Sequence, residues 1–151
     1  MIAVGSDHGG LALKEAVKSA LATRGLEVDD YGTDNGDSVD YPDFAEKVAG
    51  AVSRTEAELG ILVCGTGIGM SIVANKYPGV RAALVTDVFM AQMAKEHKYA
   101  NVLVLGGRLL DEDMDVYMVN VWLDSRYEAG RNKRRLDKIS RLEEDVRAGK
   151  F

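Results

Sequence analysis

Short apolar runs alternate with amphipathic segments along the whole chain. The apolar runs are rich in β-branched and aliphatic residues and predict five strands, at 1–4, 26–31, 61–64, 80–85 and 101–105. Apolar residues at helical spacing predict the helices between and after them, at 11–21, 44–52, 72–76, 87–98, 111–125 and 132–148. Strands that alternate with helices in this way favour βαβ units with right-handed crossovers, and therefore an α/β fold whose mainly parallel sheet is covered on both faces.

In such a sheet the carboxyl ends of the strands meet at one edge, which is where ligands bind. The loops predicted at that edge are 6–10, 64–69, 86–87 and 106–108. No linker, internal repeat or low-complexity segment interrupts the pattern, so we expect one domain over 1–151.

Composition narrows the class of protein. A chain of 151 residues with 46% hydrophobic content suits one globular core. No apolar run reaches the length of a membrane span, no signal segment opens the chain, and one cysteine without a partner favours a reducing compartment, so we expect a cytoplasmic protein without a membrane partner. The net charge of −5 argues against nucleic acid as a main partner, although residues 126–151 carry nine Lys and Arg against five Asp and Glu.

The central apolar run leads into a Gly-rich turn that contains the only cysteine, Cys64. Gly65, Gly67 and Gly69 let backbone N–H groups approach a ligand closely at the start of a helix, and these groups favour a thiolate. Three interpretations are open: an inert buried cysteine beside a structural turn, a nucleotide-binding loop, or a catalytic thiolate acting on a small anion. The spacing G-x-G-x-G fits neither the dinucleotide fingerprint nor a Walker A loop.

Two histidines could belong to the same chemistry. Asp7 and His8 follow the first strand and precede two glycines, which suits either a helix cap or an anion site. His97 lies at the end of a predicted helix, where a cation stabilises the helix dipole. These three residues with Cys64 could form a zinc site, but the set lacks any close-spaced ligand pair, so we expect no metal.

Basic residues cluster at the start of the last predicted helix. Arg131 and Arg135 are four residues apart and share one face, whereas Lys133 points to another side. Arg108 adds a guanidinium at a sheet edge. Several arginines in one place favour a phosphate group, although solvated basic helix faces are common.

Taken together, these residues resemble the type B ribose-5-phosphate isomerases, a family that also contains galactose-6-phosphate and allose-6-phosphate isomerases. The resemblance covers almost the full length and is carried by GSDHGG at 5–10, DYP at 40–42, CGTGIGMS at 64–71, ANK at 74–76, GVRA at 79–82, NVL at 101–103, and GR at 130–131 with Arg135. It implies a doubly wound, three-layer α/β/α sandwich with a five-stranded, Rossmann-like sheet in the order 2-1-3-5-4.

The resemblance also implies an activity, the aldose–ketose isomerisation of a phosphosugar, most simply ribose 5-phosphate to ribulose 5-phosphate, through an enediol and without a cofactor. Cys64 would be the base with Thr66 beside it, and Asp7 and His97 would serve ring opening and proton handling. Substrate contacts would come from His8, Tyr41, Lys98, Arg108, Arg131, Arg135 and the backbone of Gly65, Gly67, Ile68 and Gly69. His8, Arg131 and Arg135 would grip the phosphate, and Arg108 and His97 would come from the neighbouring subunit.

Two positions depart from the family pattern. Lys98 stands where many relatives have Asn, and Asn132 stands where many have His. The alternatives are therefore a four- or six-carbon sugar phosphate, or a non-catalytic phosphosugar- or nucleotide-binding module. Binding alone does not need a thiol, and the retained Cys64, Thr66 and His97 favour the enzyme.

The resemblance implies a homodimer or tetramer with sites shared between subunits, and the helix at 132–148 reaching the partner. Two features of the sequence agree with this. The basic tail suits docking on an acidic body, and Met118, Val119 and Trp122 on the helix before it are expected to offer apolar interface surface.

Overall fold

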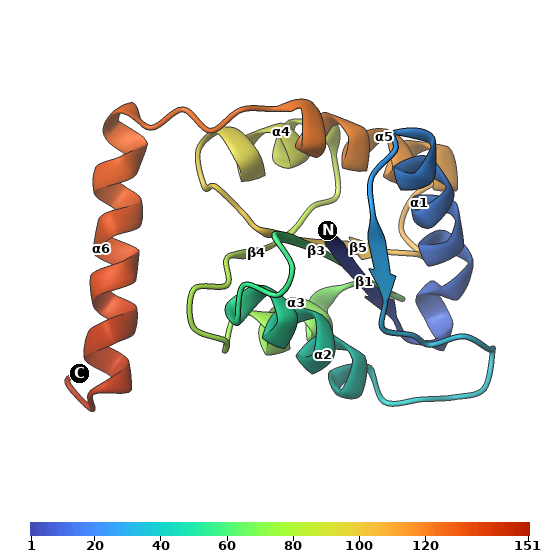
Figure 1. Cartoon of the computed structure of the whole chain (residues 1–151), viewed down its shortest axis with the longest axis horizontal. Coiled ribbons are helices and arrows are strands. Elements are labelled where there is room, and N and C mark those ends of the chain that lie inside the picture. The colour runs from blue at the N-terminus through green and yellow to red at the C-terminus, as the bar shows by residue number, and fades with distance from the viewer.

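The computed structural model describes all residues, 1–151, and its strands form one five-stranded sheet (Figure 1). The strands are β1 (Ile2–Ser6), β2 (Val28–Asp30), β3 (Leu59–Cys64), β4 (Ala82–Leu84) and β5 (Val102–Gly106). Their order is β2-β1-β3-β5-β4, and every neighbouring pair is parallel. The predicted fold class and strand order are confirmed.

Helices connect and follow the strands. They are the short 3₁₀ turn η1 (His8–Gly10) and the α-helices α1 (Leu11–Thr23), α2 (Tyr41–Ser53), α3 (Ile68–Ala74), α4 (Val88–Glu96), α5 (Glu112–Asp124) and α6 (Gly130–Arg147). None of these helices combines the length and the apolar character needed to cross a bilayer.

β4 (Ala82–Leu84) is shorter than the run at 80–85 predicted, and the two residues before it make hydrogen bonds outside the sheet. The Val80 N–H donates to the Tyr77 carbonyl, and the Arg81 N–H donates to the Asn101 side chain. Hydrophobic pattern alone does not distinguish such a loop from a strand.

The core has two halves, one on each face of the sheet. Side chains alternate along a strand, so Ile61 and Val63 pack on the side of α1, α4 and α5, whereas Leu62 and Cys64 pack on the side of α2 and α3. Helices on both faces give the expected three layers (Figure 1).

The expected interface surface on α5 is wrong. Met118, Val119 and Trp122 are fully buried in the core between α5 and the sheet. Residues i, i+1 and i+4 of a helix share a face, and here that face turns inward.

The apolar surface lies instead on α6, which stands apart from the sandwich beyond the edge strand β4 (Figure 1). Ile139, Leu142 and Val146 are about half exposed, at 52, 60 and 46%. With Leu136 they line a groove of about 690 Å³ whose other wall includes Val80 and Ala82. Glu143 bridges the groove by accepting the Gly79 N–H at 3.0 and 3.1 Å.

Candidate active site

The thiol of Cys64 lies at the carboxyl end of β3, buried, with its sulfur turned toward the Gly-rich loop. The Gly67 N–H donates to Sγ at 2.9 Å. Gly67 has a φ of 82°, and a Cβ there would lie 2.6 Å from Leu84 Cδ1 and 3.1 Å from the Leu105 carbonyl oxygen. Only glycine fits this position, and its conformation is what points an N–H group at the sulfur.

The loop around the thiol carries free donors. The N–H groups of Gly65, Thr66 and Gly69 donate to no acceptor in the chain, and the Ile68 N–H makes only a long contact of 3.4 Å with Thr66 Oγ1. Backbone N–H groups of this kind can stabilise negative charge that develops on a bound oxygen.

Asp7 and His8 lie at the same edge, directly after β1. Asp7 Oδ1 accepts the N–H groups of Gly9 at 2.9 Å and Gly10 at 3.1 Å, so Asp7 caps η1 as one of the two interpretations predicted. His8 Nδ1 accepts the Val39 N–H at 3.1 Å. A neutral His8 therefore carries its proton on Nε2, which is left to donate to an anion.

The loop that carries Val39 is held by a buried cation. The Lys14 side chain, 1% exposed, pairs with Asp30 at 2.8 Å and also donates to the Thr33 carbonyl. The Thr33 N–H in turn donates to the Ser6 carbonyl at 2.7 Å. These contacts fix the start of the loop against β1, next to the residues that follow that strand.

Arg108 lies beside the Gly-rich loop of its own chain, which corrects the expectation that the partner subunit supplies it. Its N–H donates to the Gly65 carbonyl at 3.0 Å. A Cβ on Gly65 would lie 3.5 Å from Arg108 Cδ, and one on Gly9 would lie 3.4 Å from Nη2. The physical reason is the parallel pairing of β3 with β5, which places residue 108 beside residue 65.

Tyr41, at the start of α2, also contacts the Gly-rich loop. A Cβ on Gly69 would lie 2.4 Å from Tyr41 Cζ, so the ring packs directly on that glycine. The loops after β1, β3 and β5 thus gather Asp7, His8, Cys64, Thr66 and Arg108 at one edge, as the sheet topology predicted, and the start of α2 adds Tyr41.

His97 and Lys98 lie at the opposite edge of the sheet. His97 is the C-terminal cap of α4 and precedes β5, whose first residue pairs with Gly60 rather than with Cys64. Cys64 lies four residue steps beyond Gly60 along β3, which corresponds to about 13 Å at roughly 3.3 Å per residue. One chain therefore does not bring His97 to Cys64, so the four residues considered as a zinc set do not meet within one chain.

The first turns of α6 lie with this second group. The Glu128 N–H, just before α6, donates to the Glu96 carbonyl at 2.9 Å, and Lys98 lines the same groove as Leu136. Arg131 and Arg135 are exposed on these turns. We call His97, Lys98, Arg131 and Arg135 the arginine half-site, and the group around Cys64 the thiol half-site.

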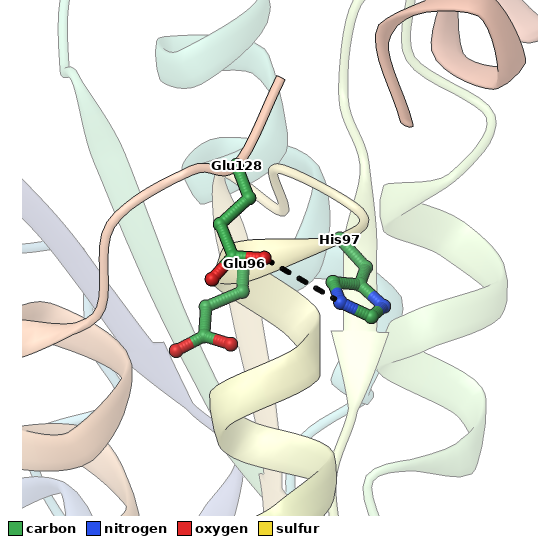
Figure 2. A group of neighbouring side chains, drawn as sticks. All are labelled: Glu96, His97 and Glu128. Atoms are coloured by element: carbon green, nitrogen blue, oxygen red, sulfur yellow. Dashed lines mark ion pairs between the residues drawn. The ribbon is translucent and has the colours of Figure 1, made fainter. Parts of the chain in front are cut away.

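Glu128 is a neighbour of His97 that the sequence did not reveal. Its Oε2 lies 4.0 Å from His97 Nε2, and Figure 2 shows the carboxylate directed at the imidazole. Glu96, His97 and Glu128 each place one potential ligand atom within 4.8 Å of the others, so this partly exposed trio has the spacing of a cation site. The residues come from two segments far apart in sequence, and no short motif could have signalled them.

Comparisons with known proteins agree on one family. A model described as Ribose/Galactose Isomerase matches residues 2–139. The chain is 41% identical over 143 residues to ribose-5-phosphate isomerase B of Escherichia coli strain K12, covering 95% of this chain and 96% of that protein.

Two solved structures are similar over nearly their whole lengths. Ribose-5-phosphate isomerase B of Clostridium thermocellum superposes with a TM-score of 0.94 at 48% identity, covering 96% of this chain and 98% of that one. The protein of that name from Mycoplasma genitalium, with bound ribulose-5-phosphate, gives a TM-score of 0.92 at 42% identity and covers 95% and 96%.

Proposed function

The chain belongs to the ribose/galactose isomerase family, and we propose that it interconverts ribose 5-phosphate and ribulose 5-phosphate with Cys64 as the base. The observation that carries this proposal is the buried thiol, with the Gly67 N–H 2.9 Å from its sulfur, among free N–H donors at the ligand-binding edge of the sheet. The names of the similar proteins, one of them holding ribulose-5-phosphate, support the choice of substrate.

In the proposed reaction the Cys64 thiolate removes the proton from C2 of open-chain ribose 5-phosphate. The electron pair moves into the C1 carbonyl and leaves an enediolate. The proton of the C2 hydroxyl passes to O1, the thiol returns its proton to C1, and the C2 oxygen becomes the ketone of ribulose 5-phosphate. A positioned base contributes on the order of 10²–10⁴-fold to such a proton transfer.

The free N–H groups beside the thiol suit the charge that develops on the sugar oxygens. Gly65, Thr66 and Gly69 offer donors that need no rearrangement, because they bond to nothing else in the chain. Preorganised donors of this kind stabilise an enediolate more than the neutral sugar. The N–H of Gly67 stays with the sulfur.

We assign the phosphate to His8 of one subunit and to Arg131 and Arg135 of the other. His8 is supported by the Val39 N–H on Nδ1, which leaves Nε2 as a donor. The two arginines lie four residues apart on exposed turns of α6, and planar guanidinium groups bind phosphate in a bidentate manner.

Ring opening requires the two half-sites to meet, so we propose a homodimer in which His97 comes from the partner subunit. Asp7 would assist from the thiol half-site. Two observations support the dimer: the half-sites lie on opposite edges of one chain, and the groove beside α6 exposes Ile139, Leu142 and Val146. An apolar groove of this kind suits the body of a second copy.

A panel of four-, five- and six-carbon aldose and ketose phosphates tests the proposal. We expect conversion of ribose 5-phosphate to be fastest, because the similar proteins carry that name. Faster turnover of a six-carbon sugar phosphate would keep the reaction and change the substrate. Binding of all the phosphates without conversion would instead favour a non-catalytic binding module.

A further inference from the structure

The carboxylate of Glu128 has no part in the reaction described so far, yet it lies beside the histidine that serves ring opening. We propose that Glu128 is a positioning residue that orients His97 for ring opening; this proposal rests on the proposed function. The side chain is directed at the imidazole, with Oε2 4.0 Å from Nε2 (Figure 2).

The backbone around Glu128 is held against the turn that carries His97. The Glu128 N–H donates to the Glu96 carbonyl at 2.9 Å. The Tyr127 ring stacks on Tyr99, with centroids 4.3 Å apart and planes inclined by 13°. The Asn132 side chain donates to the Glu128 carbonyl at 2.9 Å. The carboxylate is therefore attached to a fixed segment on both sides of residue 128.

The distance fits a contact that tightens when substrate binds. At 4.0 Å the pair is longer than a hydrogen bond, but catalytic hydrogen bonds are often long in the free enzyme and shorten in the complex. A carboxylate on Nε2 selects the tautomer with its proton there, which leaves the lone pair on Nδ1. Asp and Glu orient catalytic histidines in this manner in other enzymes.

The proton balance of ring opening gives this arrangement a role. Nδ1 of His97 accepts the proton of the C1 hydroxyl, the C1–O4 bond breaks, and the same imidazolium returns a proton to O4. His97 ends neutral, and Glu128 stays ionised throughout. The carboxylate stabilises the imidazolium while it exists and keeps the ring from rotating.

The size of the effect follows from exposure. The side chains of His97 and Glu128 are 34% and 65% exposed in the single chain, and exposed ion pairs are weak. In the proposed dimer the partner's thiol half-site covers them and reduces screening. We therefore expect loss of the Glu128 charge to slow ring opening about tenfold, less than the loss of His97 itself.

The test compares a cyclic substrate with an open one. Ribose 5-phosphate is a closed ring that must open, whereas ribulose 5-phosphate cannot close because its O5 carries the phosphate. Glu128→Gln should lower the initial rate on ribose 5-phosphate about tenfold. The rate at which C1 of ribulose 5-phosphate takes up solvent deuterium, followed by NMR, should change less than about twofold, because that exchange needs only the thiol half-site chemistry.

Three further variants make the result decisive. Glu96→Gln removes the same charge from the neighbouring residue, whose carboxylate is held by Gln92 Nε2 at 2.9 Å, and should leave both rates unchanged. Glu128→Asp keeps a carboxylate and should recover part of the lost rate. Cys64→Ser should abolish both isomerisation and deuterium uptake.

Inhibition by inorganic phosphate should be equal in wild type and Glu128→Gln, since Arg131 stays in place. Equal loss of both rates in Glu128→Gln, weakened phosphate inhibition, or the same defect in Glu96→Gln would overturn the positioning role. A wild-type protein that neither isomerises ribose 5-phosphate nor exchanges deuterium would instead overturn the proposed function.

Discussion

Among single residues, Cys64 shows how one hydrogen bond distinguishes a candidate catalytic side chain from an inert buried one. It is packed in the core like an inert cysteine, but its sulfur accepts the Gly67 N–H at 2.9 Å. That contact places a polar donor on the sulfur at the edge of the sheet where ligands bind.

Replacing Cys64 with Ser should abolish isomerisation without disturbing the fold. A hydroxyl is a far weaker base at neutral pH, so the rate should fall on the order of 10²–10⁴-fold, while the midpoint of thermal unfolding and the inhibition constant for phosphate should barely change. Initial rates of ribose 5-phosphate conversion by wild type and by Cys64→Ser measure this difference. An active serine variant would exclude Cys64 as the base.

Asp115 is a residue whose effect is on stability. Burial, with a smaller contribution from the Glu112 charge, raises the pKa of Asp115 from 3.8 to about 6, and one of its oxygens has no hydrogen-bond partner. The folded chain therefore binds this proton more tightly than the unfolded chain does. The stabilisation that protonated Asp115 gives the folded state is fully present below about pH 4 and is lost as the pH rises through about 6.

Asp115→Asn should remove this pH dependence, because the amide stays neutral. We expect the variant to match wild type near pH 4 and to be more stable at pH 7.5, by on the order of 1–3 kcal/mol. Urea unfolding at several pH values measures this difference. Asp113→Asn, which removes an exposed charge from the same turn of α5, is the control. A gain that is equal at all pH values would contradict the assignment.

The sequence could predict which residues gather at the thiol half-site, because the carboxyl ends of parallel strands meet whatever the side chains are. It could not predict how Arg108 and Glu128 are used. The chain that supplies Arg108 follows from the pairing of β5 with β3, and the position of Glu128 follows from the path of the linker before α6. Both are tertiary facts with no local signature.

Among the helices, α6 carries basic residues that differ in whether they form an ion pair within the chain. Arg131 and Arg135 carry no ion pair within the chain, whereas Lys133 pairs with Asp137 at 2.7 Å, which raises the pKa of Lys133. The helix therefore offers the arginines to a ligand and holds Lys133 in a contact of its own.

Arg131→Ala and Arg135→Ala should each weaken inhibition by inorganic phosphate about ten- to a hundredfold, since a charge-assisted hydrogen bond is worth roughly 1.5–3 kcal/mol. Lys133→Ala is the matched control and should change inhibition less than about twofold. Competition assays measure all three. Equal effects at 131 and 133 would mean that α6 is a diffuse basic surface.

The element boundaries show where periodicity succeeds and fails. Long amphipathic helices such as α1, α2 and α6 were predicted to within a few residues, because one face of each is consistently apolar or polar. For a helix with apolar residues on more than one face, it is harder to predict which face packs against the sheet. On α5, Met118, Val119 and Trp122 were expected at a surface and fill the core instead, because the sheet lies on their side of the helix.

For the assembled molecule, the proposed dimer predicts that two inactive variants restore activity when they are combined in one heterodimer. Cys64→Ser damages only the thiol half-site, and His97→Asn damages only the arginine half-site. Neither homodimer should turn over substrate appreciably. A heterodimer of the two should contain one site with both residues intact, by the two-fold symmetry of an isologous pair.

Coexpression of Cys64→Ser with His97→Asn under two affinity tags isolates such heterodimers. Their activity should return to about half that of a wild-type dimer. Purified heterodimers without activity would show that each site is built within one chain, against the placement of Cys64 and His97 on opposite sheet edges.

In the proposed dimer, the opposite placement of the two half-sites would also make activity depend on dilution. A lone chain would hold all the proposed catalytic groups. It could not isomerise ribose 5-phosphate, because its thiol half-site and its arginine half-site lie on opposite edges of the sheet. Dissociation would silence both sites of a dimer in one event, and reassociation would restore both together. Turnover per chain would then depend on how much of the protein is present, so that a small change in abundance near the dissociation constant would change metabolic flux more than proportionally.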